Sequence, residues 1–164
     1  MRIIGLDPGT ATTGYGIVDV IDGAFDLVGY GVITTYPHTP MQERLQTIYE
    51  DINTLIEEYQ PDTAGIEELF FGRNVTTAIT VGQARGVLLL ALSQAKIPIG
   101  EYTPLKIKDA VTGYGKAEKA QVQMMVRNLL NLDETPRPDD AADGLAVAIT
   151  HYYYTRFDSL SQVE

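Results

Sequence analysis

The hydrophobic pattern of this chain changes its period near residue 38, and this change limits the possible folds more than any other feature. Before it, three β-rich runs follow one another, and the last two are separated by Asp22-Gly23, a strong hairpin signal. After it, apolar residues recur at helical spacing. The pattern therefore predicts an antiparallel meander followed by alternating helices and strands. The three β-rich runs cover residues 2–7, 14–20 and 27–34.

The start of the first helix is indicated by Thr39-Pro40-Met41-Gln42, a capping box with proline at the first helical position. Beyond it, short apolar runs alternate with longer amphipathic stretches. This order predicts an α/β fold, a mixed five-stranded sheet flanked by helices, in a single domain over residues 1–157 with a frayed tail at 158–164. The first helix is expected to begin at Pro40, to carry its apolar stripe from Met41 to Tyr59 and to end before Pro61. The later elements are expected at 62–68, 75–95, 97–102, 117–131 and 138–157, with a short helix that begins at Thr103-Pro104 and ends at Gly113.

The charge of the chain is unevenly distributed. Its 164 residues carry a net charge of −10, which is unusual for a nucleic-acid-binding protein. Residues 69–127, however, hold eight basic side chains and only three acidic ones. We therefore expect a basic face on an acidic body, although solvated helices would have the same composition.

Several classes of protein are excluded or disfavoured by composition. The chain has no cysteine, so it has neither disulfides nor thiolate metal sites. Its N-terminal apolar stretch stops at Asp7, which is too short for a secretory signal, and the run from Val87 to Leu92 is too short to span a membrane. We expect a cytoplasmic protein without a membrane segment.

Acidic residues stand where structure alone has little use for them. Asp7 ends the first strand, Glu67 ends the fourth, and Asp140 and Asp143 share one face of the last helix. Each could be a turn residue or a carboxylate at a helix N-terminus. If the first and fourth strands are parallel neighbours, however, the carboxylates converge at one sheet edge. Two hard divalent ions would relieve their repulsion and could hydrolyse a phosphodiester through activated water.

The loop after the first strand permits a second interpretation. Gly5 to Gly14 is similar to the first phosphate loop of the actin, Hsp70 and sugar-kinase superfamily. Those ATPases need two such domains and a second glycine-rich loop. This chain has neither the length nor the second loop, which disfavours an ATPase.

Taken together, the motifs resemble the RuvC family of crossover junction endodeoxyribonucleases, the bacterial Holliday junction resolvases. The resemblance extends over about residues 2 to 154, and the order and spacing of the motifs make it specific. The matching stretches are Gly5-Leu6-Asp7-Pro8-Gly9, Thr13-Gly14-Tyr15-Gly16, Ile66-Glu67 with Phe70, Gly82-Gln83-Ala84-Arg85-Gly86, Ala117-Glu118-Lys119, and Asp140-Ala141-Ala142-Asp143 with His151.

The resemblance implies a ribonuclease H-like fold and a homodimer that acts on four-way DNA junctions. Each subunit would make one nick, and the paired nicks would be symmetric. The implied site is Asp7, Glu67, Asp140 and Asp143, holding Mg²⁺, two ions per subunit, with Mn²⁺ as a possible substitute. Glu68 and Asp139 fall outside the family's positions and are treated as neighbours.

The resemblance also implies roles in DNA binding. Phe70 would stack on a base at the opened crossover, Arg73 and Asn74 would touch the backbone, and Lys108 and Lys119 would lie near the scissile phosphate. The alternatives are a core phenylalanine and ordinary surface lysines. The helix near 75–95 would form the dimer interface, unless it is simply the central buried helix, and branch-migration helicase subunits would be further partners.

Two other functions remain open at this point: a ribonuclease H-like nuclease that acts on RNA or another nucleic-acid structure, and a junction-binding module without activity. His151 is not expected to join the metal site. It lies eight residues beyond Asp143 on the same helix, about 12 Å along the axis, and is expected in packing or at the surface.

Overall fold

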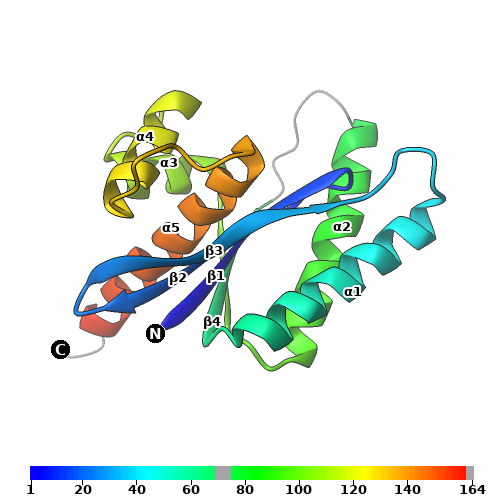
Figure 1. Cartoon of the computed structure of the whole chain (residues 1–164), viewed down its shortest axis with the longest axis horizontal. Helices are drawn as coiled ribbons and strands as arrows, with labels where there is room; N and C mark the ends of the chain where they lie inside the picture. Colours follow the sequence, from blue (N-terminus) through cyan, green and yellow to red (C-terminus); the bar gives the residue numbers. More distant parts are fainter. Residues whose placement is uncertain (69–74, 162–164) are drawn as a thin grey trace.

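The computed structural model describes residues 1–68 and 75–161, apart from the side chains of 157–161. Their backbone forms a five-stranded sheet with the strand order β3-β2-β1-β4-β5 (Figure 1). The strands are β1 (Arg2–Asp7), β2 (Thr12–Ile21), β3 (Ala24–Thr34), β4 (Thr63–Glu67) and β5 (Ile99–Tyr102). The helices are α1 (Met41–Tyr59), α2 (Val75–Gln94), α3 (Pro104–Thr112), α4 (Lys119–Leu129) and α5 (Asp139–Ser161).

The sheet is mixed, as the sequence predicts. β2 pairs antiparallel with β1 and β3, whereas β4 pairs parallel with β1 and β5. The β2–β3 turn has positive φ at Asp22 (51°) and Gly23 (84°), which suits a tight hairpin between twisted strands. Because β1 and β4 are parallel neighbours, their C-terminal ends meet at one edge of the sheet.

Helices cover both faces of the sheet and close two separate cores. α1 and α2 lie on one face, and α3, α4 and α5 lie on the other (Figure 1). Side chains alternate along the strands: Ile3 belongs to the core under α5, whereas Ile4 and Leu6 belong to the core under α1 and α2. The predicted α/β fold with a mixed five-stranded sheet is confirmed.

Several helix boundaries differ from the sequence prediction, among them both ends of α4, which runs from Lys119 to Leu129 and not over 117–131. Pro40 is the N-cap of α1, with an extended backbone (ψ 143°), so the helix begins at Met41 and no side chain caps it. The predicted capping box is therefore wrong, because the extended proline moves Thr39 out of the capping position. α5 continues to Ser161, four residues beyond the predicted end at Phe157. A glutamate caps α4 instead, where Glu118 and Gln121 form the reciprocal bonds of a capping box.

α2 is unusually apolar for a helix on a sheet face. By length and composition alone it could cross a membrane, but core helices of soluble proteins pass the same test, and 28% of its most apolar window is buried here. Leu88 and Leu92 pack under the sheet. Val75, Ile79 and Leu90 are 65%, 59% and 52% exposed and form an uncovered apolar stripe on the opposite side.

α5 lies unusually close to the sheet because glycines line the contact. Gly5 and Gly16 are cross-strand partners on β1 and β2. A Cβ at Gly5 would overlap the backbone of Gly144, and one at Gly16 would come within 2.5 Å of the Leu145 nitrogen. Real Cβ atoms essentially never approach so closely, so only glycine permits this backbone-on-backbone packing.

We predict that Gly16→Ala destabilises the protein by about 2 kcal/mol or more, because overpacking a contact with backbone forces the helix to move. Gly115→Ala is the control, since its Cβ would meet the exposed Leu105 side chain, at 3.2 Å from Cγ, and the Leu105 carbonyl at 3.6 Å, an ordinary contact distance. Denaturant unfolding of both variants measures the difference. Equal stabilities would show that α5 does not depend on the glycine contact.

Candidate metal centre

Two strands bring Asp7 and Glu67 side by side. Each is the last residue of its strand, and the parallel register pairs the preceding residues, Leu6 with Ile66. The turn after Asp7 is held by Thr13, which is fully buried and whose hydroxyl donates to the Gly9 carbonyl at 2.8 Å. Burial and the neighbouring Glu67 carboxyl both raise the pKa of Asp7, which favours its protonated form when no cation is bound.

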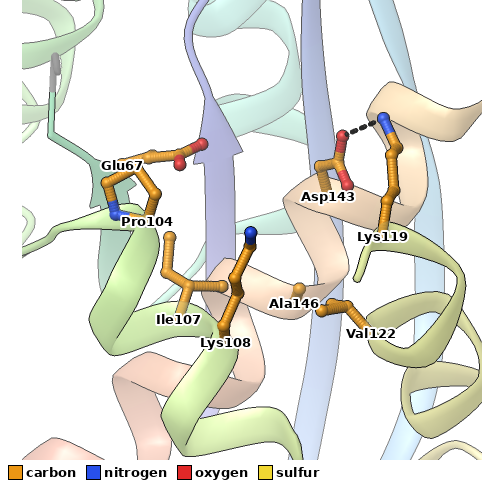
Figure 2. A pocket seen from close by; sticks show the side chains of 8 residues that line it. All are labelled: Glu67, Pro104, Ile107, Lys108, Lys119, Val122, Asp143 and Ala146. Atoms are coloured by element: carbon orange, nitrogen blue, oxygen red, sulfur yellow. Dashed lines mark hydrogen bonds and ion pairs between the residues drawn. The ribbon is translucent and has the colours of Figure 1, made fainter. Parts of the chain in front are cut away.

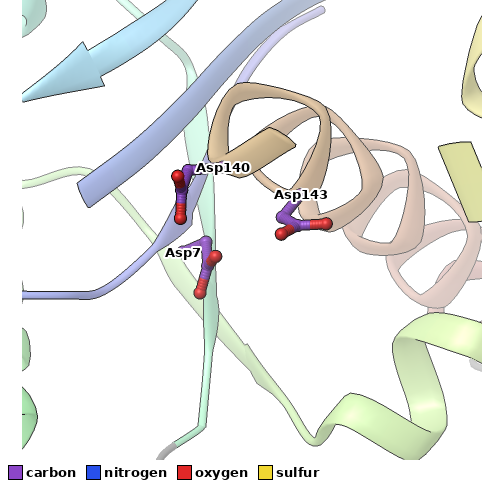
Figure 3. A group of neighbouring side chains, drawn as sticks. All are labelled: Asp7, Asp140 and Asp143. Carbon is purple, nitrogen blue, oxygen red and sulfur yellow. The ribbon is translucent and has the colours of Figure 1, made fainter. Parts of the chain in front are cut away.

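α5 adds two carboxylates from above the sheet. Gly14 is the cross-strand partner of Asp7, and a Cβ there would overlap the Asp140 carbonyl. The glycine thus allows the start of α5 to lie directly over the end of β1. Carboxylate oxygens of Asp7, Asp140 and Asp143 all lie within 4.8 Å of one another (Figure 3). The carboxylates predicted from the sequence therefore come together at one edge of the sheet.

The electrostatics of this cluster favour a cation. Burial, the hydrogen bond to Glu67 and the charges of Glu67, Asp143 and Asp140 raise the pKa of Asp7 well above its ordinary value. Burial also raises the pKa of Glu67 and of Asp143. The donors are all carboxylate oxygens, which hard divalent ions such as Mg²⁺ prefer. The residues present therefore fit a divalent metal.

Two lysines reach the edge of the same site. Lys108 comes from α3 and points into the space between Glu67 and Asp143, and Lys119 of α4 bonds Asp143 at 2.9 Å (Figure 2). Both charges lower the pKa of Glu67, against the stronger effect of its burial. They border a cavity of about 230 Å³ with an apolar floor. Its lining is Glu67, Pro104, Ile107, Lys108, Lys119, Val122, Asp143 and Ala146.

The neighbouring acidic residues lie outside the cluster. Asp139 pairs with Arg137 at 2.6 Å and lies 4.0 Å from Lys119 Nζ, and its carboxylate is not part of the Asp7, Asp140 and Asp143 group. The Glu68 backbone N–H donates to the Tyr102 carbonyl, and its side chain lines a second cavity next to Asp7. Phe70, Arg73 and Asn74, which the sequence assigned to DNA binding, lie outside the described residues.

His151 belongs to the packing, as expected. It lies on α5, is 3% exposed and contacts Thr63 of β4 and Tyr102 of β5. The Thr63 hydroxyl donates its proton to the Pro98 carbonyl, so its oxygen accepts from His151 Nε2 at 2.7 Å. His151 Nδ1 then accepts from the Tyr102 hydroxyl at 2.8 Å. Burial lowers the pKa of His151 to about 4, which keeps the imidazole neutral at physiological pH.

Sequence reasoning missed one residue beside the site. Arg85 on α2 donates from Nε to the Glu67 carbonyl at 3.2 Å and pairs with the Glu101 carboxylate. Its side chain also lines the second cavity with Asp7. The available signal was a single charged residue within the otherwise uncharged helix 75–94.

The fold matches proteins of known structure. One is "T. thermophilus RuvC in complex with Holliday junction substrate", with a TM-score of 0.91, 37% identity and 96% of each chain covered. Another is a Thermus thermophilus RuvC structure, with a TM-score of 0.89 and 38% identity over 96% of this chain and 97% of that one. A yeast mitochondrial Holliday junction resolvase shares the fold alone, at 14% identity and a TM-score of 0.64.

Sequence comparisons agree with this match. The family model described as "Crossover junction endodeoxyribonuclease RuvC" matches residues 3–151. A protein of that name from Chloroflexus aurantiacus is 58% identical over 93% of both chains. Another from Desulforamulus reducens is 52% identical over 92% of this chain and 93% of its own.

The sheet order and the acidic edge define the class as an enzyme of the ribonuclease H-like fold. Within that class, the chain belongs to the RuvC family of crossover junction endodeoxyribonucleases. This family is metal-dependent, in agreement with the acidic cluster.

We predict that Asp7→Asn stabilises the metal-free protein at neutral pH. A carboxyl whose pKa is raised by folding contributes stability at low pH that is lost as the pH rises through the folded value. Replacing this carboxyl by an uncharged amide removes that cost and should raise the melting temperature in chelator by about 2–8 °C, which corresponds to about 1–2 kcal/mol in a domain of this size. Thermal melts from pH 4 to 8 test this.

Magnesium provides the internal control. It should stabilise the wild type more than the variant, because Asp7→Asn removes ligand charge. A variant that melts below the wild type in chelator at pH 8 would show that the Asp7 charge is not a source of repulsion.

Proposed function

We propose that this protein resolves four-way DNA junctions by paired, symmetric, metal-dependent phosphodiester hydrolysis during recombination and repair. The observation that carries the proposal is the convergence of Asp7, Glu67, Asp140 and Asp143 beside two lysines. Support also comes from the likeness to a RuvC that was solved with a Holliday junction substrate.

The four carboxylates are proposed as the ligands of Mg²⁺, two ions per subunit, with Mn²⁺ as a substitute. When bound, such a pair supplies an activated water and stabilises the leaving oxygen. Asp7, at the centre of the cluster, would be shared, with Glu67 on one side and the α5 pair on the other. Lys108 and Lys119 would neutralise the charge that builds on the scissile phosphate.

The proposed DNA contacts extend beyond the lysines. Phe70 would stack on a base at the opened crossover, an interaction worth about 1–3 kcal/mol per base. Arg73 and Asn74 would contact the backbone. These three roles come from the family resemblance and from their place in the sequence just after β4.

A homodimer is proposed through α2. The supporting observation is the exposed apolar stripe of Val75, Ile79 and Leu90, which also includes Gly86, where an added Cβ would meet nothing within 4 Å. Uncovered apolar surface of this kind favours association. Two subunits would provide the two active sites that paired nicks require. We further propose a cytoplasmic location, and branch-migration helicase subunits as partners on the strength of the family resemblance.

The central experiment is cleavage of a labelled four-way junction with Mg²⁺ or with chelator. Asp7→Asn should slow cleavage by more than about a hundredfold, because even groups that only orient a metal ligand are worth about 10–100-fold. Junction binding should stay within about threefold of the wild type, since ligand charge and not a phosphate contact is removed. Gel mapping of the nicks gives the cleavage rate, and gel-shift titration gives the affinity for the junction.

Asp139→Asn is the matched control, since Asp139 lies in the same helical turn but pairs with Arg137 and reaches Lys119 only at 4.0 Å. It should cut at close to the wild-type rate.

A substrate panel with flaps and RNA–DNA hybrids separates the other functions. Preference for one of these would indicate a different ribonuclease H-like nuclease, and binding without turnover would indicate a junction-binding module.

The dimer has its own test. Leu90→Glu should give a monomer in analytical ultracentrifugation and should lose paired nicking, because it buries a charge in the proposed interface. Ile21→Glu, at the 55% exposed end of β2, is the control and should remain a dimer. If Leu90→Glu remains dimeric, the interface lies elsewhere.

A further inference from the structure

We infer that Arg85 is a positioning residue for the metal centre, and that it holds Glu67 in place through the backbone of β4. This inference rests on the proposed function, because it assumes that Glu67 is a metal ligand. Arg85 contacts the Glu67 carbonyl, not its carboxylate. It would therefore set the position of the ligand without competing with the metal for it.

The geometry begins with the peptide bond that joins Glu67 to Glu68. The Glu68 N–H donates to the Tyr102 carbonyl of β5 at 2.8 Å. In a planar trans peptide the C=O points opposite to the N–H, so the Glu67 carbonyl points away from β5. On that side the pairing of β4 with β1 has already ended, at Leu6 and Ile66. Arg85 Nε supplies a partner for this carbonyl at 3.2 Å, where the sheet no longer does.

Arg85 is itself held firmly. Its Nη2 pairs with the Glu101 carboxylate on β5, and its side chain is only 18% exposed. The neighbouring residue Ala84 is fully buried, which anchors this part of α2 against the sheet. The guanidinium therefore joins three elements: α2 through its own backbone, β5 through Glu101, and the end of β4 through Glu67.

Glu67 needs such support because its carboxyl must stay beside that of Asp7 at the very end of its strand. Its carboxyl faces Asp7 across the strands, and the charge of Asp143 acts on it as well. It is also the last residue of β4, so regular strand pairing holds the chain only on the N-terminal side of Glu67. A ligand that moves by even a fraction of an ångström weakens the binding of an ion that demands regular octahedral geometry.

The chain contains a matched control for this arrangement. At the opposite end of β1, Arg2 makes an ion pair with Asp19 at 2.8 Å and donates from Nη1 to the Tyr59 carbonyl at 2.9 Å. Like Arg85, Arg2 thus contacts one carboxylate and one backbone carbonyl at the end of a helix or strand, but far from the acidic cluster. If losing such an arginine only lowers stability, the Arg2 and Arg85 variants should be affected alike.

The test is Mn²⁺ binding to the free protein, followed by electron paramagnetic resonance, for the wild type, Arg85→Ala and Arg2→Ala. Arg85→Ala should raise the Mn²⁺ dissociation constant by about 10–100-fold, the range for groups that orient a metal ligand. Arg2→Ala should leave it unchanged. Junction cleavage by Arg85→Ala should recover at high Mn²⁺, because added metal compensates for a displaced ligand.

Two conservative variants protect the test against loss of fold. Arg85→Lys keeps one donor for the carbonyl, so its Mn²⁺ affinity should lie between those of the wild type and Arg85→Ala. Glu101→Gln should weaken Mn²⁺ binding in the same direction but less. Melting curves show whether each variant is folded. If Arg85→Ala is unfolded, the Mn²⁺ affinities of Arg85→Lys and Glu101→Gln decide whether Arg85 positions Glu67.

The outcomes separate the two proposals. If the folded Arg85 variants bind Mn²⁺ within twofold of the wild type, the positioning role is wrong while the nuclease proposal stands. If the wild type and Asp7→Asn bind Mn²⁺ equally and neither cuts junctions, the proposed function itself fails.

Discussion

The metal centre depends on one packing constraint, the direct contact between the backbone of α5 and the glycines of β1 and β2. Gly14 lies opposite Asp7 in the sheet and beneath Asp140 in the helix. With any side chain at that position, α5 would be lifted off the sheet and its carboxylates would move away from Asp7. The glycines have no chemical role, yet they set the distances on which the site depends.

The close approach creates an electrostatic problem that the surrounding elements partly relieve. Like charges gather where burial makes them costly, so the pKa values of Asp7 and Asp143 are raised. The N-terminus of α5 favours the negative charge of Asp140 in its first turn. Lys108 and Lys119 add positive charge from α3 and α4. The remaining repulsion is the physical reason why the site favours a divalent cation.

Much of this arrangement could be predicted from the sequence, because it depends on local rules. The hairpin signal at Asp22-Gly23 and the change of hydrophobic period locate the strands and helices. The strand-end positions of Asp7 and Glu67 place them at a common edge once a parallel pair is assumed. The start of α1 was wrong because a capping pattern does not decide whether the proline is helical or extended, and here it is extended.

The chain by itself therefore determined its fold class, the identity of the four carboxylates and, through the order of its motifs, its family. Only the tertiary structure decided how these groups lie together: that α5 rests on glycine, and that Arg85 reaches the backbone behind Glu67. The reason is physical. Periodicity and spacing are properties of neighbouring residues, whereas a contact between segments far apart in sequence depends on the packing of the whole sheet and its helices.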